Sequence, residues 1–350
     1  MDYDNKMILK GMNIEELKKW CIINNFSKFR ANQIYEWLYF HGVNKTQEMY
    51  NLSQECRKII DKECDLSTLS MVSKTVSDNK KTTKYLFKTN DNNFIESVSM
   101  IDESNRHTVC VSSQSGCNLG CDFCATAKMG LMQNLSAGEI IDQLIIIRSL
   151  SSQPIDNVVY MGMGEPFLNY ENVIKSADIL NDKKGFNISF NKITISTVGI
   201  IPKIKKFIDD KVRYGLAISL NASNDIVRDD IMPINKKWPI ADLIYVNKAY
   251  ASQNKRKKIT FEYVIMDNIN SSVEDAIELA KILKSAKCKI NIIPYNETDG
   301  KYKRPSDETI NEFIDTLSLH NNNNFQIMVR WSNGLDIDAG CGQLAISNNT

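Results

Sequence analysis

Three cysteines with short, regular spacing are the residues most able to carry chemistry. Cys117, Cys121 and Cys124 follow the pattern C-x₃-C-x₂-C, and thiolates this close together can ligate one metal centre. A 4Fe–4S cluster needs four ligands, so one iron would stay open. An open iron can bind the amino and carboxylate groups of S-adenosylmethionine and pass it one electron, which yields a 5′-deoxyadenosyl radical. Three structural thiols, or a zinc site completed by a histidine, are the alternatives.

Two further cysteines lie in segments that could serve the same chemistry. Cys341 stands between Gly340 and Gly342, on what we expect to be a mobile, closely packed loop. Cys110 lies on an expected strand beside the cluster cysteines, where a buried inert thiol is the usual interpretation. The other cysteines lie among helix or strand residues and are predicted to be core thiols: Cys21, Cys56, Cys64 and Cys288.

The elements that position these cysteines alternate between strand and helix patterns. Expected strands fall near 108–113, 157–162, 191–197, 214–220, 259–266, 288–294 and 325–331. Expected helices fall near 136–150, 170–181, 200–209, 239–252, 272–284 and 307–320. This repetition predicts an α/β fold with a parallel sheet and helices packed outside it. Six βα units are too few for a closed eight-fold barrel, so an open partial (βα)6 barrel is expected over residues 108–345.

Two segments are expected before this core domain. Residues 1–66 read as a small helical domain, in which Asn13 and Ser53 cap helices and Gly42 ends one. Residues 67–107 read as a linking β segment with strands near 71–76, 84–88 and 94–101. Residues 346–350 form a tail. The basic residues of the helical domain, such as Lys28 and Arg30, are either RNA contacts or a solvated surface.

Polar motifs follow several of the expected strands, where α/β folds place their chemistry. Gly164 and Glu165 follow the second strand; glycine lets a ligand approach, and the carboxylate can accept from an ammonium group. Small hydroxyls and amides occur at other strand ends and can bind a ribose or a carboxylate, or form local turns instead. These residues are Ser196, Ser219, Asn221 and Asn296.

Composition limits the class of protein. The chain has 350 residues, with 43 Lys and Arg against 42 Asp and Glu, so a nucleic-acid partner would have to be bound by local patches. No secretory leader and no apolar run of membrane-spanning length are evident. The nine cysteines are therefore expected in a reducing cytoplasm, where clustered thiols indicate metal binding or catalysis.

The ordered motifs together resemble the RlmN/Cfr family of radical S-adenosylmethionine methyltransferases. The resemblance runs from about residue 8 to 345 and rests on the cluster cysteines with segments 109–114, 161–166, 195–197, 232–237 and 336–344. It implies methylation of an adenosine carbon in 23S ribosomal RNA, and also next to the anticodon of some transfer RNAs. Ring carbon C2 is neither nucleophilic nor acidic enough for ordinary methyl transfer, which explains the need for a radical.

The resemblance also implies roles for individual residues. Cys341 would be methylated by one S-adenosylmethionine, a second would supply the radical, and Cys110 would resolve the protein–RNA adduct through a transient disulfide with Cys341. Glu96 would be the proton acceptor. The cofactor contacts would be Gly164, Glu165, Ser196, Ser219, Leu220, Asn221 and Asn296. A one-electron reductase such as a flavodoxin would be a partner, no membrane is involved, and the protein would act as a monomer.

Two residues depart from the family pattern, and one choice of product stays open. Asn221 replaces the usual His and cannot protonate, while Gly340 replaces the usual Ala and loosens the loop beside Cys341. Segments 164–166 and 261–264 resemble the C2 branch rather than the C8 branch that confers antibiotic resistance. A non-catalytic iron–sulfur or zinc protein that binds RNA is the alternative from another class.

Overall fold

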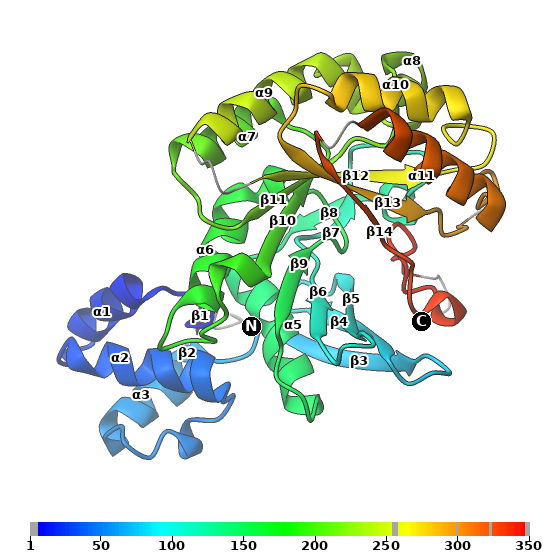
Figure 1. The fold of residues 1–350 in the computed structure, drawn as a ribbon. Helices are drawn as coiled ribbons and strands as arrows, with labels where there is room; N and C mark the ends of the chain where they lie inside the picture. The colour runs from blue at the N-terminus through cyan, green and yellow to red at the C-terminus, as the bar shows by residue number, and fades with distance from the viewer. Residues whose placement is uncertain (1–5, 254–257, 299, 322–323, 347–350) are drawn as a thin grey trace.

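A ten-stranded mixed sheet organises the molecule (Figure 1). The computed structural model describes residues 6–253, 258–298, 300–321 and 324–346. The strand order is β14-β13-β12-β11-β10-β9-β6-β5-β4-β3. The strands from β6 to β14 in this order are parallel: β6 (His107–Cys110), β9 (Asn157–Tyr160), β10 (Ile193–Thr197), β11 (Gly215–Ser219), β12 (Ile259–Ile265), β13 (Cys288–Pro294) and β14 (Gln326–Val329). The described sheet has β14 at one edge and β3 at the other, so it remains open.

Helices connect successive parallel strands and pack outside the sheet (Figure 1). They are α5 (Ala137–Leu150), α6 (Tyr170–Asn181), α7 (Ile201–Asp209), the short α8 (Asp225–Ile231), α9 (Ile240–Gln253), α10 (Val273–Leu283) and α11 (Asp307–Asn321). The predicted open α/β partial barrel is confirmed. Alternating apolar side chains of the strands are buried against these helices, as in Ile259, Phe261, Tyr263 and Ile265 of β12.

Three antiparallel strands precede the parallel part. They are β3 (Leu69–Val76), β4 (Thr82–Thr89) and β5 (Phe94–Ile101), and β5 pairs with β6. The linking strands were therefore expected at the right places, and they extend the main sheet. The expected first core strand, 108–113, is too long, since β6 ends at Cys110. A separate hairpin follows it, formed by β7 (Gln114–Cys117) and β8 (Gly130–Asn134), with α4 (Ala125–Lys128) between them.

The N-terminal segment is helical, as its caps indicate. It contains α1 (Ile14–Ile23), α2 (Phe29–Tyr35) continued by the π-helical η1 (Glu36–His41), η2 (Thr46–Glu48) and α3 (Gln54–Glu63). Asn13 caps α1 in a capping box with Glu16, and Ser53 caps α3. A two-stranded parallel pair, β1 (Met7–Ile8) with β2 (Cys64–Asp65), joins the two ends of this segment. The domain boundaries at 66 and 107 stay predictions, and residues 347–350 of the expected tail lie outside the described residues.

A buried ion pair attaches the N-terminal segment to the core. Lys10 Nζ lies 2.6 Å from Asp142 Oδ1 on α5, and both side chains are fully buried. Asn44 accepts a second hydrogen bond from Lys10 at 2.7 Å, and Asp142 accepts from the backbone of Thr68 at 2.6 Å. The pair is thus surrounded by the hydrogen bonds that a buried charge needs.

None of the helices in the described part of the chain combines the length and the apolar character needed to cross a membrane.

Candidate active site

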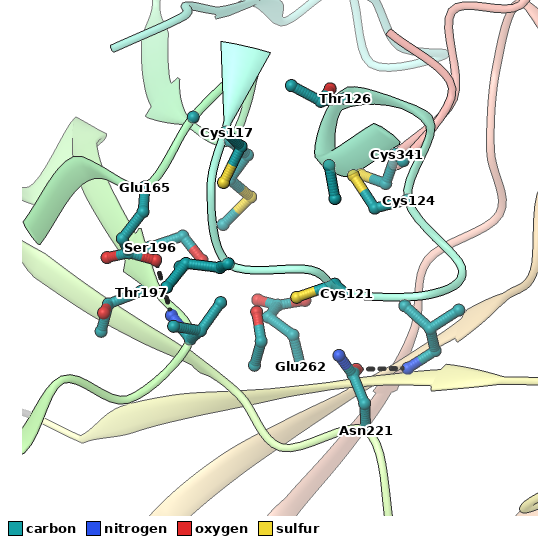
Figure 2. A pocket seen from close by; sticks show the side chains of 18 of the residues that line it. Cys117, Cys121, Cys124, Thr126, Glu165, Ser196, Thr197, Asn221, Glu262 and Cys341 are labelled. Carbon is teal, nitrogen blue, oxygen red and sulfur yellow. Dashed lines mark hydrogen bonds between the residues drawn. The ribbon is translucent and has the colours of Figure 1, made fainter. Parts of the chain in front are cut away.

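The three cluster cysteines point into one cavity (Figure 2). Cys117 ends β7, and Cys121 and Cys124 lie in the turn that leads into α4. We call this space the central cavity; besides these cysteines, its wall includes Gly164, Glu165, Ser196, Ser219, Asn221, Glu262 and Cys341. Cys117 and Cys121 are buried, and Cys124 is half-buried. Three convergent thiols as a donor set suit a cluster that takes three protein ligands.

Burial keeps these thiols protonated in the absence of a metal centre. It raises the pKa of Cys117 to about 11 and the pKa values of Cys121 and Cys124 above the usual thiol value. Because only thiolates bind iron, loading the site must release protons. Among the described residues, no group of three or more His, Cys, Asp or Glu side chains is already placed to hold a metal ion.

The loop after β9 fits against the cluster hairpin at Gly164. Gly164 has φ +93°, and a Cβ there would lie 2.4 Å from the Cβ of Gln114, so a side chain would meet both strain and a clash. Gln114 Oε1 accepts a hydrogen bond from the Glu165 backbone at 2.7 Å, and Gln114 Nε2 donates to Asn134 on β8 at 2.7 Å. The hairpin that carries Cys117 and the loop that carries Glu165 are therefore held together.

Glu165 is a buried carboxyl group in the wall of the central cavity (Figure 2). It accepts hydrogen bonds from the backbone amides of Phe167 and Val198, both at 2.9 Å. Burial outweighs these bonds and raises the pKa of Glu165 to about 7. Such a carboxylate is well suited to pair with a cation, because an ammonium group would replace the missing solvation.

The other residues expected at the cofactor divide into two sets. Ser196, Ser219 and Asn221 line the central cavity. Asn221 adopts φ +57° and accepts from the Val264 amide at 2.9 Å. Leu220 is fully buried and does not line the cavity, and Asn296 instead contacts the Cys341 backbone.

Cys341 is carried by residues 332–346, which we call the C-terminal strap because they run from the end of β14 to the cluster hairpin. The Ala125 amide donates to the Gly342 carbonyl at 2.8 Å, and Thr126 Oγ1 donates to the Leu344 carbonyl at 2.5 Å. Both bonds go to the first residues of α4, directly after Cys124. Cys341 thereby joins the wall of the central cavity (Figure 2).

Cys341 also faces a second cavity, which we call the lateral cavity. Its wall includes Cys110 and Thr108 of β6, Val98 and Met100 of β5, and Arg330 and Trp331 after β14. Met161, Leu344 and Cys341 line both cavities. Burial raises the pKa of Cys110 to about 12. The two thiols expected to act together thus share one cavity, and all nine cysteines of the chain are free thiols.

Glu96 lies next to the strap rather than in either cavity wall. Its carboxylate accepts from the Ala345 amide at 3.1 Å and lies 3.4 Å from Lys84 Nζ. Burial raises its pKa despite both contacts. Its backbone is fixed from the other side, because Ser112 Oγ donates to the Glu96 carbonyl at 2.5 Å.

Three polar residues of the site were not expected as site residues. Glu262 lines the central cavity from the middle of β12 and accepts from Asn291 at 3.0 Å. Arg330 lines the lateral cavity. Its interaction with Cys341 raises the pKa of the Arg330 guanidinium, and Glu262 raises it to a lesser extent. Both are charged residues within or directly after an apolar strand, a sequence pattern that could have indicated them as site residues.

Arg228 is the third such residue, and no comparable sequence pattern indicates it. It is fully buried in α8 and donates to the carbonyls of Val198, Ser219 and Leu220 at 2.8–2.9 Å, so it ties together strand ends that border the cavity.

Comparisons with known proteins agree with this geometry. Residues 111–301 match the model of the radical SAM superfamily, and residues 7–66 match that of the ribosomal RNA large subunit methyltransferase N-terminal domain. The Dual-specificity RNA methyltransferase RlmN of Geobacter sulfurreducens is 38% identical over 97% of this chain and 92% of its own length. A relative from Pseudothermotoga lettingae with the corresponding RlmN name is 43% identical over 92% of both chains.

A solved structure extends the similarity to the whole fold. The crystal structure of a radical SAM methyltransferase from Sphaerobacter thermophilus superposes with a TM-score of 0.91 at 37% identity, covering 97% of this chain and 99% of that one. These similarities, at about 40% identity, extend over nearly the full length of the chain and therefore beyond the two matched domains. The chain belongs to the RlmN family of dual-specificity RNA methyltransferases in the radical SAM superfamily.

Proposed function

We propose that this enzyme methylates C2 of an adenosine in 23S ribosomal RNA, and of the adenosine next to the anticodon in some transfer RNAs, through an S-methylated Cys341. One observation carries the proposal: Cys341 lines the same cavity as Cys117, Cys121 and Cys124 and, on its other side, the cavity of Cys110. A residue that only stabilised the fold would not need to face both.

The residues of the central cavity would hold the cofactors. Cys117, Cys121 and Cys124 bind the 4Fe–4S cluster as thiolates, and Glu165 accepts from the amino group of S-adenosylmethionine. Ser196, Ser219 and Asn221 offer further polar contacts from neighbouring strand ends. When bound, these cofactors supply a 5′-deoxyadenosyl radical at this place.

The two thiols and one carboxylate perform the remaining steps. The Cys341 thiolate would take the methyl group of one S-adenosylmethionine, and this methyl would later give up a hydrogen atom and bond to C2. Glu96 would take the ring proton, which requires that its contact with Ala345 opens when RNA binds, and the unpaired electron left on the adduct would pass back to the one-electron carrier. The Cys110 thiolate would then attack the Cys341 sulfur and break the bond from sulfur to carbon; a proton from solvent completes the methyl group of the released base, and the two sulfurs form a disulfide. Two electrons from a cellular thiol reductant restore both thiols.

The partners of this cycle follow from its needs. One electron must reach the cluster in each turnover, so we include a one-electron reductase such as a flavodoxin. All residues assigned above come from one chain, which suits a monomer, and reduced thiols suit the cytoplasm.

The deciding experiment is anaerobic cluster reconstitution followed by mass spectrometry of RNA treated with methyl-labelled S-adenosylmethionine. We expect the label at C2 of adenine in 23S ribosomal RNA and in transfer RNA. Label at C8 would instead assign the antibiotic-resistance branch of the family. RNA that binds without acquiring label, while the cluster is intact, would support the non-catalytic alternative.

A further inference from the structure

The lateral cavity gives Cys341 a second face, and that face needs an occupant. Under the proposed function, a methyl carrier takes its carbon on one side and delivers it on another. Cys341, Met161 and Leu344 form the wall between the central and lateral cavities. The RNA base that receives the carbon is therefore expected to approach from the lateral side, and residues at the mouth of this cavity are the ones that would meet the RNA.

Trp331 lies at that mouth with an unusual exposure. It is the second residue after β14, lines the lateral cavity and is 50% exposed. By contrast, Trp20 and Trp37 are 5% and 6% exposed, and Trp238 is half-buried. The indole of Trp331 thus offers a flat π surface to whatever enters the cavity.

Arg304 covers one side of this indole. Its guanidinium carbon lies 5.7 Å from the ring centroid, within the range of a cation–π contact. Asp307 accepts from Arg304 at 2.6 Å, which fixes the guanidinium in this position. An indole with a cation on one side and half of its surface exposed is a preformed surface for stacking.

The charged residues that line the lateral cavity do not form an alternative binding site for RNA phosphates. Lys81 and Arg106 line the lateral cavity, but so do Asp102 and Glu103, and Arg106 is paired with Asp102 at 2.7 Å. Arg330, the third cation of this wall, lies half-buried and interacts with Cys341 and Glu262. The other four charges balance and would neither attract nor position phosphates strongly. The aromatic surface is the feature that distinguishes this rim.

We propose that Trp331, backed by Arg304, is a stacking platform for an unpaired base of the substrate RNA at the mouth of the lateral cavity. It is a positioning residue: it holds the RNA so that the target adenosine reaches Cys341, without taking part in bond changes. Stacking of a base on an aromatic side chain is largely insensitive to sequence, because every base has a π face. It neutralises no phosphate, so it should not contribute to the salt dependence of binding.

The test uses the reconstituted holoenzyme and a synthetic RNA hairpin with an unpaired adenosine in its loop. Trp331→Ala should weaken hairpin binding and raise KM for RNA by roughly 5- to 150-fold, as expected for loss of one base–aromatic stack. Trp331→Phe should retain most of the affinity. Tyr245→Ala is the matched control, since Tyr245 is a 70% exposed aromatic residue on a different groove, between α9 and α10.

Two readouts separate stacking from a structural effect. The slope of log Kd against log salt should be the same for Trp331→Ala and wild type, and methylation of Cys341 in the absence of RNA should keep its rate. Hairpin binding should quench wild-type tryptophan fluorescence, and Trp331→Phe should abolish the quenching while still binding.

The inference is overturned if Trp331→Ala leaves KM and Kd unchanged, or if Trp331→Phe shows the same quenching as wild type. Loss of Cys341 methylation in Trp331→Ala would also overturn it, because the residue would then be supporting the strap. If wild type neither binds nor methylates the hairpin and ribosomal RNA, the proposed function itself fails, and this inference with it.

Discussion

The side-chain amide of Asn296 donates a hydrogen bond to the backbone carbonyl of Cys341, with an N···O distance of 3.1 Å. Gly340 makes this approach possible, because a Cβ at that position would lie 2.5 Å from Asn296 Nδ2 and 2.7 Å from Gln343 Oε1. The glycine that seemed only to loosen the loop thus permits a contact that holds the methyl-carrying residue in place.

Asn296→Ala is expected to slow methyl transfer to Cys341 by roughly 2- to 10-fold, since one hydrogen bond contributes about 0.5–1.5 kcal/mol. The measurement is mass spectrometry of the Cys341 peptide after a timed reaction with labelled S-adenosylmethionine. Gly340→Ala should act in the same direction. Normal peptide labelling combined with weaker S-adenosylmethionine binding would assign Asn296 to the cofactor instead, as the family resemblance implies.

Replacing any one of Cys117, Cys121 or Cys124 by Ala should remove the brown absorbance of the reconstituted cluster and all RNA methylation. Under the proposed function, each would supply one of only three protein ligands. Circular dichroism should show a folded protein, because the main apolar core does not include these three cysteines. Cys288→Ala, at a buried cysteine of β13, is the matched control and should keep the cluster. A variant of the three that retained both absorbance and turnover would refute the ligand assignment.

Cys110→Ala should trap the protein covalently on RNA, because no thiolate remains to attack the Cys341 sulfur after the carbon has bonded to the base. The adduct would appear on a denaturing gel as a slow band that ribonuclease removes. Cys341→Ala should also make no product, but should give no adduct. Free methylated RNA from Cys110→Ala at the normal rate, or an adduct from Cys341→Ala, would exclude the two-thiol mechanism.

Glu165 predicts a pH dependence of cofactor binding. Burial raises its pKa to about 7 in the unliganded protein, whereas only the carboxylate can pair with the amino group of S-adenosylmethionine. Affinity should therefore be highest above pH 7 and fall about tenfold for each pH unit well below it, since protons then compete with the ligand. Isothermal titration of the holoenzyme from pH 5.5 to about 8.5 measures this.

Glu165→Gln is the control for this pH dependence, because it cannot ionise; its binding should be weak and nearly independent of pH. The variant should also change how the free energy of unfolding depends on pH, because it lacks the contribution of the Glu165 carboxyl group. A carboxyl group whose folded pKa is raised binds more protons in the folded state between about 4.3 and 7, so stability from this group declines as pH rises through that window. The same pH profile in wild type and variant would point to another group, such as Glu262.

Local patterns were enough to predict most of the fold. The parallel strands, their connecting helices and the caps at Asn13 and Ser53 each depend on residues within a few positions of one another. The β7–β8 hairpin was missed because Gln114–Cys117 shows no alternation of apolar and polar residues; packing against the loop at Gly164 holds it in place. The position of such a hairpin is decided by contacts that lie far apart in the sequence.

The site shows the same limit. Spacing alone was sufficient to bring Cys117, Cys121 and Cys124 together, since they lie within eight consecutive residues. The contact between Ala345 and Glu96, by contrast, joins residues that are 249 positions apart. Whether Glu96 faces a cavity or the strap depends on how the last segment of the chain crosses the sheet, and no local pattern contains that information.

The buried pair of Lys10 and Asp142 has a mechanical consequence. Swinging the N-terminal segment away from α5 would break this fully buried pair and leave Asp142 without its partner. Removing one partner of a buried ion pair costs about 3–5 kcal/mol, because the remaining charge is left uncompensated. The segment therefore behaves as a fixed arm rather than a hinged clamp. An RNA that contacted both the N-terminal segment and the active site would have to span a fixed distance between them. The separation of these two contacts along the RNA would therefore itself select the substrate.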